Sequence, residues 1–212
     1  MNLAKLLHLP GPLVLASQSP RRLALLRQIG CEPVVIPADL HEDKHAEGLD
    51  AWRYAALLAR DKARAVVATA PPHAVIIGAD TIVVVDGEIL NKPVDAQDAV
   101  RMLRLLSGKT HTVITAVCVL AGSYECIEQS STAVSFRALS DDEILAYIQS
   151  GSPMDKAGSY GIQDDFGAVF VERIEGCYYT IVGLPLTLLY RMLSSIPSNP
   201  FSLTPVSLGG AT

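Results

Sequence analysis

Three pairs of apolar segments constrain the fold of this chain most, because a short turn joins the two members of each pair. The pairs lie at residues 74–90, 110–137 and 168–182. Such a turn connects antiparallel strands, since a parallel connection needs a dozen or more residues. Segments with the apolar spacing of helices separate the pairs. We therefore expect an α/β fold in which a mixed, twisted sheet and flanking helices form two lobes around a central cleft.

Turn residues and helix caps set the boundaries of the expected elements. The last pair is expected to be a hairpin of residues 168–174 and 177–182. Helices are expected from Ser19 to Gly30, over 51–68, from Asp95 to Gly108, after a capping box that begins at Ser140, and from Pro185 to Leu193. Residues 1–194 are expected to form a single domain, and residues 195–212, rich in serine, proline and glycine, a flexible C-terminal tail.

The composition argues against several classes of protein. With 50% hydrophobic and 18% charged residues, the chain has the composition of a globular protein and not of a disordered one. Its net charge of −5 argues against a nucleic-acid partner, because general nucleic-acid binders carry a basic surface. Any anion site must therefore be a local basic cluster. The four cysteines are scattered without C-x-x-C spacing, so we expect neither a zinc site nor a disulfide framework.

The sequence also lacks the usual signals of export or membrane insertion. No stretch reaches the ~18 uninterrupted apolar residues of a membrane span. Residues 1–9 lack the apolar length and the cleavage site of a signal peptide. We therefore expect a cytoplasmic protein with reduced thiols and no membrane partner.

Residues 13–22 join a predicted buried strand to the start of a helix. Ser19 is a suitable N-cap, and Pro20 suits the first helical position because its missing N–H costs nothing there. Arg21 and Arg22 follow in the first turn, where unpaired amides and the helix dipole already attract anions. Taken alone, these residues leave two interpretations open: a phosphate-binding turn, or an ordinary strand-to-helix turn with two solvated arginines.

Two other segments carry residues that could take part in chemistry. Asp80 ends the apolar run that begins at residue 74, and the ends of such strands often present reactive groups, although a turn-former or helix cap is the alternative. Residues 151–167 are rich in glycine and charge, and a surface loop is the alternative there. Gly108-Lys109-Thr110 looks like part of a phosphate-binding loop. We reject it because it follows a helix and precedes a strand, the reverse of the required order.

Seven short motifs in a fixed order make the sequence more specific than any of these signals alone. Together they resemble the Maf family of nucleoside triphosphate pyrophosphatases, over residues 12 to about 194. The motifs are Ser-Gln-Ser-Pro-Arg-Arg (17–22), Gly-Ala-Asp-Thr (78–81), Asn-Lys-Pro (91–93), Leu-Ser-Gly-Lys-Thr-His (106–111), Asp-Lys-Ala-Gly (155–158), Tyr-Gly-Ile-Gln (160–163) and Val-Gly-Leu-Pro-Leu (182–186).

The resemblance implies a Maf/ITPase-like fold and the hydrolysis of a nucleoside triphosphate to the monophosphate and pyrophosphate with a divalent metal, Mg²⁺ or Mn²⁺. Asp80 stands at the position of the proton acceptor. The metal ligands implied are Glu42 and Asp80, with Asp43 as an alternative to Glu42. The resemblance leaves a homodimer open. The substrate-binding residues implied are Ser17, Arg21, Arg22, Lys62, Thr81, Lys92 and Gln163.

The combination of Arg21, Thr81 and Gln163 resembles the branch of the family that hydrolyses dTTP and UTP, and modified pyrimidine triphosphates are included in this expectation. The Gln163 amide offers a donor and an acceptor side by side, which match the adjacent C=O and N–H of uracil or thymine. Asp80 could deprotonate a water or bind the metal, and since an ordinary aspartate pKa is near ~3.9, both roles stay open. Two alternatives remain: another non-standard nucleotide such as 7-methyl-GTP, or a non-catalytic nucleotide-binding regulator of cell division or septation.

Overall fold

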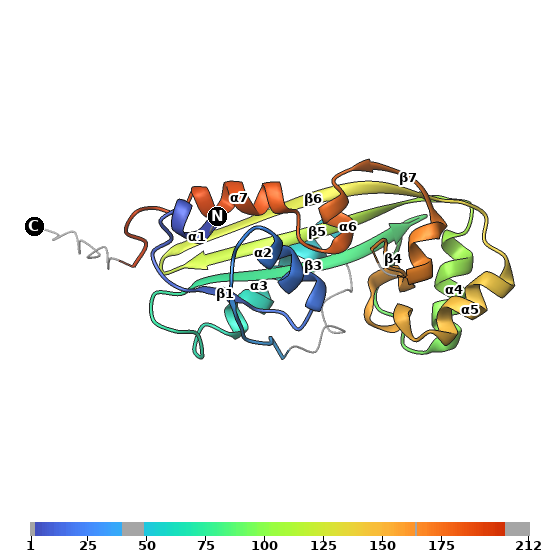
Figure 1. The fold of residues 1–212 in the computed structure, drawn as a ribbon, viewed down its shortest axis with the longest axis horizontal. Coiled ribbons are helices and arrows are strands. Elements are labelled where there is room, and N and C mark those ends of the chain that lie inside the picture. The colour runs from blue at the N-terminus through green and yellow to red at the C-terminus, as the bar shows by residue number, and fades with distance from the viewer. Residues whose placement is uncertain (1–2, 40–48, 164, 202–212) are drawn as a thin grey trace, which may run out of the picture.

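The fold is built on one mixed, twisted sheet that runs the length of the molecule (Figure 1). The computed structural model describes residues 3–39, 49–163 and 165–201. Within them, seven strands pair in the order β2-β1-β3-β5-β6-β7, and β4 also pairs with β3. The strands are β1 (Leu13–Leu15), β2 (Val34–Val35), β3 (Val75–Val85), β4 (Glu88–Leu90), β5 (Thr110–Ala121), β6 (Tyr124–Phe136) and β7 (Val171–Gly176).

The strand directions confirm the expected mixed sheet. β1 runs parallel to β2 and β3, and every other pairing is antiparallel. The helices are α1 (Leu3–Leu6), α2 (Pro20–Gln28), α3 (Ala51–Ala65), α4 (Ala96–Leu106), α5 (Asp141–Gln149), α6 (Tyr178–Val182) and α7 (Leu186–Ser194), with short 3₁₀ turns η2 (Ser152–Asp155), η3 (Ala157–Ser159) and η4 (Asp165–Phe170).

Three apolar clusters fill the space between the sheet and the helices. Leu15 and Ile77 pack with α2 and α7 on one face, whereas Val14 and Ile76 pack with α3 on the other, because successive strand residues point to opposite faces. The third cluster lies at the far end of the sheet, where α4 and α5 cover it (Figure 1). The clusters give the molecule two lobes that share the long strands.

One edge of β3 has a gap between the two lobes. β5 pairs with β3 from Ile76 to Val84 and so occupies its other edge. On the open edge, β1 pairs with β3 up to Ile77, and β4 pairs with it from Val83. Residues 78–82 lie in the gap between these two partner strands. This gap is the central feature that positions the site.

The predicted hairpin of residues 168–174 and 177–182 is wrong in its second half and in its start. Residues 165–170 form η4, and residues 178–182 form helix α6. The Thr132 hydroxyl contacts both backbone polar groups of Cys177, which turns the chain away from the strand path after β7. Gly183, with φ of 115°, then ends the helix. Tertiary contacts thus override the strand preference of Tyr-Tyr-Thr-Ile-Val.

The chain's first and last described residues also pack against the domain. α1 was not expected, and Leu3 joins the cluster beside α2 and α7. Ser123 donates hydrogen bonds to the Pro200 carbonyl through its N–H and its hydroxyl, and Phe201 packs edge-on against His73. The rest of the expected tail, residues 202–212, lies outside the described residues. No helix in the described part of the chain is long and apolar enough to cross a membrane, and the four cysteines form no disulfide.

Candidate active site

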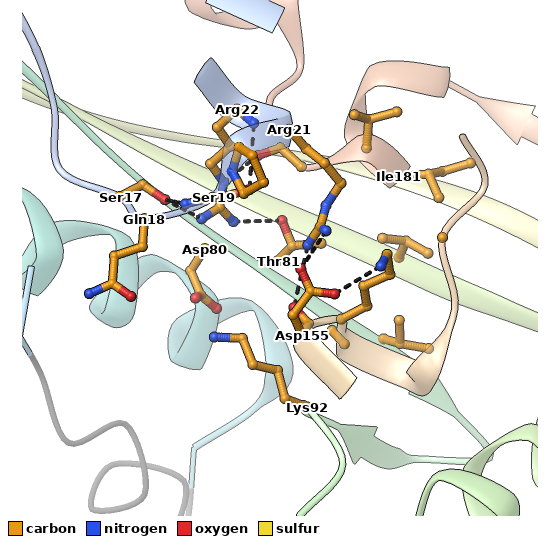
Figure 2. Close-up of a pocket in the computed structure, with 18 of the residues that line it drawn as sticks. Ser17, Gln18, Ser19, Arg21, Arg22, Asp80, Thr81, Lys92, Asp155 and Ile181 are labelled. Atoms are coloured by element: carbon orange, nitrogen blue, oxygen red, sulfur yellow. Dashed lines mark hydrogen bonds and ion pairs between the residues drawn. The ribbon is translucent and has the colours of Figure 1, made fainter. Parts of the chain in front are cut away.

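A cleft of about 300 Å³ opens at the gap in the β3 edge, between the two lobes (Figure 2). The β1–α2 turn forms one wall and the segment around η2 and η3 forms the other. Asp80 faces α3, whereas Thr81 lies on the opposite face of β3, because neighbouring strand residues alternate. The cleft therefore reaches both faces of the sheet. The predicted residues that line it are Ser17, Arg21, Arg22, Lys62, Asp80, Thr81, Lys92 and Gln163.

The β1–α2 turn has the predicted cap. Ser19 accepts a hydrogen bond from the Arg22 N–H, and Pro20 occupies the first turn of α2. The Ser17 hydroxyl accepts from the Ser19 N–H and from Arg22 Nη1, both at 3.1 Å. These two bonds use both lone pairs of the Ser17 oxygen, so its own O–H is left to donate. Ser17 thus suits an acceptor such as a phosphate oxygen.

Arg22 ties three segments together. Its Nε donates to the Gly183 carbonyl at 2.8 Å, Nη1 donates to Ser17, and Nη2 donates to the Thr81 hydroxyl at 3.1 Å. The guanidinium therefore joins the β1–α2 turn, the end of α6 and the gap in β3. That Arg22 also contacts a phosphate stays a prediction.

Asp80 and Lys62 form a buried ion pair at the floor of the cleft. Lys62 Nζ lies 2.5 Å from Asp80 Oδ1, and the two side chains are only 11% and 8% exposed. Gly78 lets α3 approach β3 closely enough for this contact. A Cβ there would lie 2.2 Å from the Ala59 carbonyl oxygen and 2.7 Å from the Ala63 nitrogen, so a larger residue would push α3 away.

Arg21 crosses the cleft from α2 to the second lobe. Its Nη1 lies 2.7 Å from Asp155 Oδ2, and Lys156 Nζ lies 2.8 Å from Asp155 Oδ1. Burial raises the pKa of Asp155, but the hydrogen bonds from Lys156 and Arg21 outweigh it, so that this pKa lies below its ordinary value. Asp155 and Lys156 belong to a motif seen in the sequence, yet sequence reasoning gave them no role. Asp155 holds Arg21 across the cleft, and Lys156 contacts the other oxygen of the same carboxylate.

Two predicted substrate-binding residues stand at the rim. Lys92, just after β4, points toward Asp80 and makes no ion pair or hydrogen bond through its ammonium with the residues that the structure describes (Figure 2). Gln163 is exposed on the wall that also carries Ile162. Glu42, the predicted metal ligand, and Asp43, its alternative, lie outside the described residues.

The part of the cleft on the Thr81 face is lined by apolar side chains. Val83 and its β5 neighbour Val113 form its floor, and Ile162 and Ile181 line it from other elements. Tyr160 also lines it, and its hydroxyl lies 2.8 Å from Nε2 of the buried His111. An apolar lining of this kind suits a nucleobase.

The described residues could hold a divalent cation only if a bound substrate supplied further ligands. No group of three or more His, Cys, Asp or Glu that could hold a metal occurs in the described ranges. Asp80 contributes one carboxylate, whose Oδ1 contacts Lys62. Mg²⁺ is usually held by one or two carboxylates together with substrate phosphates, so one aspartate is compatible with it.

Sequence reasoning missed Thr115, which lies beside Thr81 in the sheet. Thr115 is fully buried and lies directly opposite Thr81 in the β3–β5 register. The sequence did carry a sign of this residue, because the polar Thr115 interrupts the apolar run of β5. Lys109, from the rejected phosphate-loop motif, pairs instead with the exposed Asp86 at 2.8 Å.

Comparison with known proteins shows which family the chain resembles. The chain matches the family described as Maf-like protein over residues 12–196. A protein of Koribacter versatilis (strain Ellin345) named dTTP/UTP pyrophosphatase is 51% identical over 181 residues, which cover 85% of this chain and 92% of the relative. Proteins of the same name from Salinibacter ruber (strain DSM 13855 / M31) and Syntrophomonas wolfei subsp. wolfei (strain DSM 2245B / Goettingen) are 52% and 50% identical, over 89% and 87% of this chain and 92% and 97% of their own lengths. Because the match extends over nearly all of the domain, the chain belongs to the Maf-like protein family.

Proposed function

We propose that this protein hydrolyses dTTP and UTP to the nucleoside monophosphate and pyrophosphate. The observation that carries the proposal is that residues from separate motifs meet in one cleft, where the carboxylate of Asp80 lies among cationic side chains. The name shared by relatives at about half identity supports the same activity.

The cationic residues suit the polyphosphate, which carries roughly four negative charges. Lys62 lies at the floor, Lys92 at the rim, and Arg21 at the start of α2. Ser17 adds an O–H donor, because protein groups already use both of its lone pairs. Phosphoryl transfer depends chiefly on positioning and charge stabilisation, which this set of donors supplies.

Asp80 is the residue that we assign to the attacking water. Lys62 fixes one carboxylate oxygen, Oδ1, and the other has no partner among the described residues. Asp80 is thereby oriented to accept a hydrogen bond from a water beside the α-phosphate. Asp80 and, by the family resemblance, Glu42 would hold Mg²⁺ or Mn²⁺, which neutralises phosphate charge and lowers the pKa of a bound water.

The base would occupy the apolar part of the cleft, with Gln163 at its edge. Val83 and Val113 offer an apolar surface, and the Gln163 amide can pair with the adjacent C=O and N–H of uracil or thymine. A site with such paired groups rejects a base that leaves them unpaired. We further propose that the protein acts in the cytoplasm on free nucleotides, consistent with its net charge of −5.

The test is pyrophosphate release from a panel of triphosphates, with Mg²⁺, with Mn²⁺ and with excess EDTA. We expect dTTP and UTP to give the highest kcat/KM, and EDTA to abolish release. Asp80→Asn should lower kcat at least about 100-fold. The matched control, Asp86→Asn, changes an exposed aspartate outside the cleft and should retain full activity.

Three results would contradict the proposal in different ways. A higher kcat/KM for 7-methyl-GTP would assign the same chemistry to another nucleotide. Tight nucleotide binding without turnover would indicate a non-catalytic regulator. Full activity of Asp80→Asn would remove Asp80 from the central role.

A further inference from the structure

A line of hydroxyl groups leads from the cleft into the protein at Thr81. The Thr81 hydroxyl lies 2.9 Å from the Thr115 hydroxyl, and the Thr115 hydroxyl lies 2.7 Å from the Thr180 carbonyl oxygen. Thr115 and Thr180 are fully buried, whereas Thr81 is partly exposed and lines the cleft. These contacts join β3, β5 and α6.

The direction of each hydrogen bond follows from counting protons. A carbonyl oxygen can only accept, so Thr115 must donate its single hydroxyl proton to Thr180. Thr115 therefore has no proton left for Thr81 and must accept in that contact. Thr81 must donate, and its own proton points away from the cleft toward Thr115.

Arg22 occupies a second position on the Thr81 oxygen. Its Nη2 donates to that oxygen at 3.1 Å, which uses one of the two lone pairs. Gly183 packs closely against this arrangement, since a Cβ there would lie 3.3 Å from the Thr81 oxygen and 3.5 Å from Arg22 Nε. One lone pair of Thr81 then remains for a ligand.

We propose that Thr115 is a positioning residue for substrate specificity, because it takes the Thr81 proton and leaves Thr81 able only to accept a hydrogen bond from the nucleotide. The group recognised is therefore a hydrogen-bond donor of the nucleoside. Two donors of dTTP fit this chemistry: the 3′-hydroxyl of the sugar, and the N3–H of the base, whose single proton would then go to Thr81 in place of the Gln163 oxygen, while the Gln163 N–H still donates to the adjacent C=O. Cytosine carries a lone pair at N3, which would face the lone pair of Thr81. This inference rests on the proposed function.

The test compares Thr115→Val with Thr115→Ser. Valine has nearly the shape of threonine but accepts no hydrogen bond, so the Thr81 hydroxyl is free to turn and donate toward the cleft. Serine keeps the hydroxyl. We measure kcat/KM for dTTP, for dCTP and for 2′,3′-dideoxy-TTP, which lacks the 3′-hydroxyl. Ratios between substrates are taken within one protein preparation, so a misfolded fraction cancels.

If Thr81 accepts from N3–H, Thr115→Val should lower the preference for dTTP over dCTP at least about tenfold. If it accepts from the sugar, the preference for dTTP over the dideoxy nucleotide should fall instead. Thr115→Ser should keep both wild-type ratios. Unchanged ratios in Thr115→Val, or an equal loss in Thr115→Ser, would overturn the inference while the proposed function stands. A wild-type protein that releases no pyrophosphate from dTTP or UTP would overturn the proposed function itself.

Discussion

The buried ion pair between Lys62 and Asp80 links the stability of the fold to the proposed function. Both charges are largely taken out of water on folding, and the two groups lie 2.5 Å apart. Removing one partner of a buried pair leaves an uncompensated charge, which costs more than the pair contributes. A substitution here will therefore change stability and activity together, and a test must separate the two.

Lys62→Met should lower the free energy of unfolding by about 3 kcal/mol, because Asp80 is left buried without its cation. Adding Asp80→Asn should restore part of this stability, since the amide carries no charge, without restoring pyrophosphate release. Urea unfolding of both variants measures the coupling. Lys109→Met is the control: its ion pair is exposed, so its effect should stay below about 0.5 kcal/mol. Additive losses in the double variant would contradict this account.

His111 should make the protein less stable in mild acid. Burial lowers its pKa from 6.5 to about 4, so between these values the unfolded chain binds a proton that the folded protein does not. Stability should therefore fall as the pH drops from 6.5 to 4, by up to about 3 kcal/mol from this residue. Urea unfolding at pH 7, 5 and 4 should show a smaller loss for His111→Leu than for the wild type. Parallel pH dependences would exclude His111 as the cause.

For single residues, the sequence indicated which side chains line the cleft, but it did not indicate which side chains contact one another. The Ser19 cap was predictable because capping is local. The contacts of Arg22 with Thr81 and Gly183 were not, because they join positions 59 and 161 residues apart. Glu42 and the metal it would bind stay predictions.

Helix α5 shows how a local motif and a tertiary contact reinforce one another. Ser140 and Glu143 form the predicted capping box, and Arg137 at the end of β6 pairs with the same glutamate at 2.7 Å. The hydrogen bonds from Arg137, and then from Ser140, lower the pKa of Glu143 to about 2. The carboxylate thus anchors α5 to the sheet.

Glu143→Gln should destabilise the protein at pH 7, where the native carboxylate is ionised. The folded pKa lies below the ordinary value, so the contribution is complete above about pH 4.5 and is lost as the pH falls toward 2. The difference in urea midpoint between wild type and variant should therefore shrink over that range. Glu175→Gln, which breaks an exposed contact with Arg173, should have little effect at any pH. A constant difference down to pH 2 would contradict the role of the charge.

The elements that were predicted correctly are those whose signals are local. β5 and β6 follow from two long apolar or alternating runs with a Gly-containing turn between them. Helix α6 was predicted as a strand because its five residues favour strands by themselves, and only Thr132 and Gly183 show otherwise. Short segments of this kind are decided by tertiary contacts.

For the whole molecule, the cleft between the lobes should make stability depend on nucleotide. An α,β-methylene analogue of UTP with Mg²⁺, at 100 times its Kd, should stabilise the protein by about 2.7 kcal/mol. This corresponds to a rise in Tm of roughly 5–10 °C for a chain of this size. At the same concentration, the ATP analogue should give a smaller rise, and Gln163→Ala should reduce the difference between the two. Equal rises in the wild type would argue against recognition of the base.

The lobe arrangement was predictable, whereas the position of the cleft was not. Alternating elements and linked strand pairs indicate a mixed sheet. The gap beside residues 78–82, however, depends on where β1 stops at Ile77 and β4 begins at Val83. The register between strands distant in sequence decides this, and no local pattern encodes it.

Because β3 passes from one lobe to the other while bonded to β5 across the gap, residues 78–82 connect the lobes as a paired strand. A joint needs a few residues whose backbone angles can change freely, and residues 78–82 are held by β5 through this stretch. A hinge at these residues would have to break pairs between β3 and β5. The spacing between the cleft walls therefore depends on the β3–β5 pairing, which is set when the chain folds, and we expect it to limit the size of the nucleotide that fits.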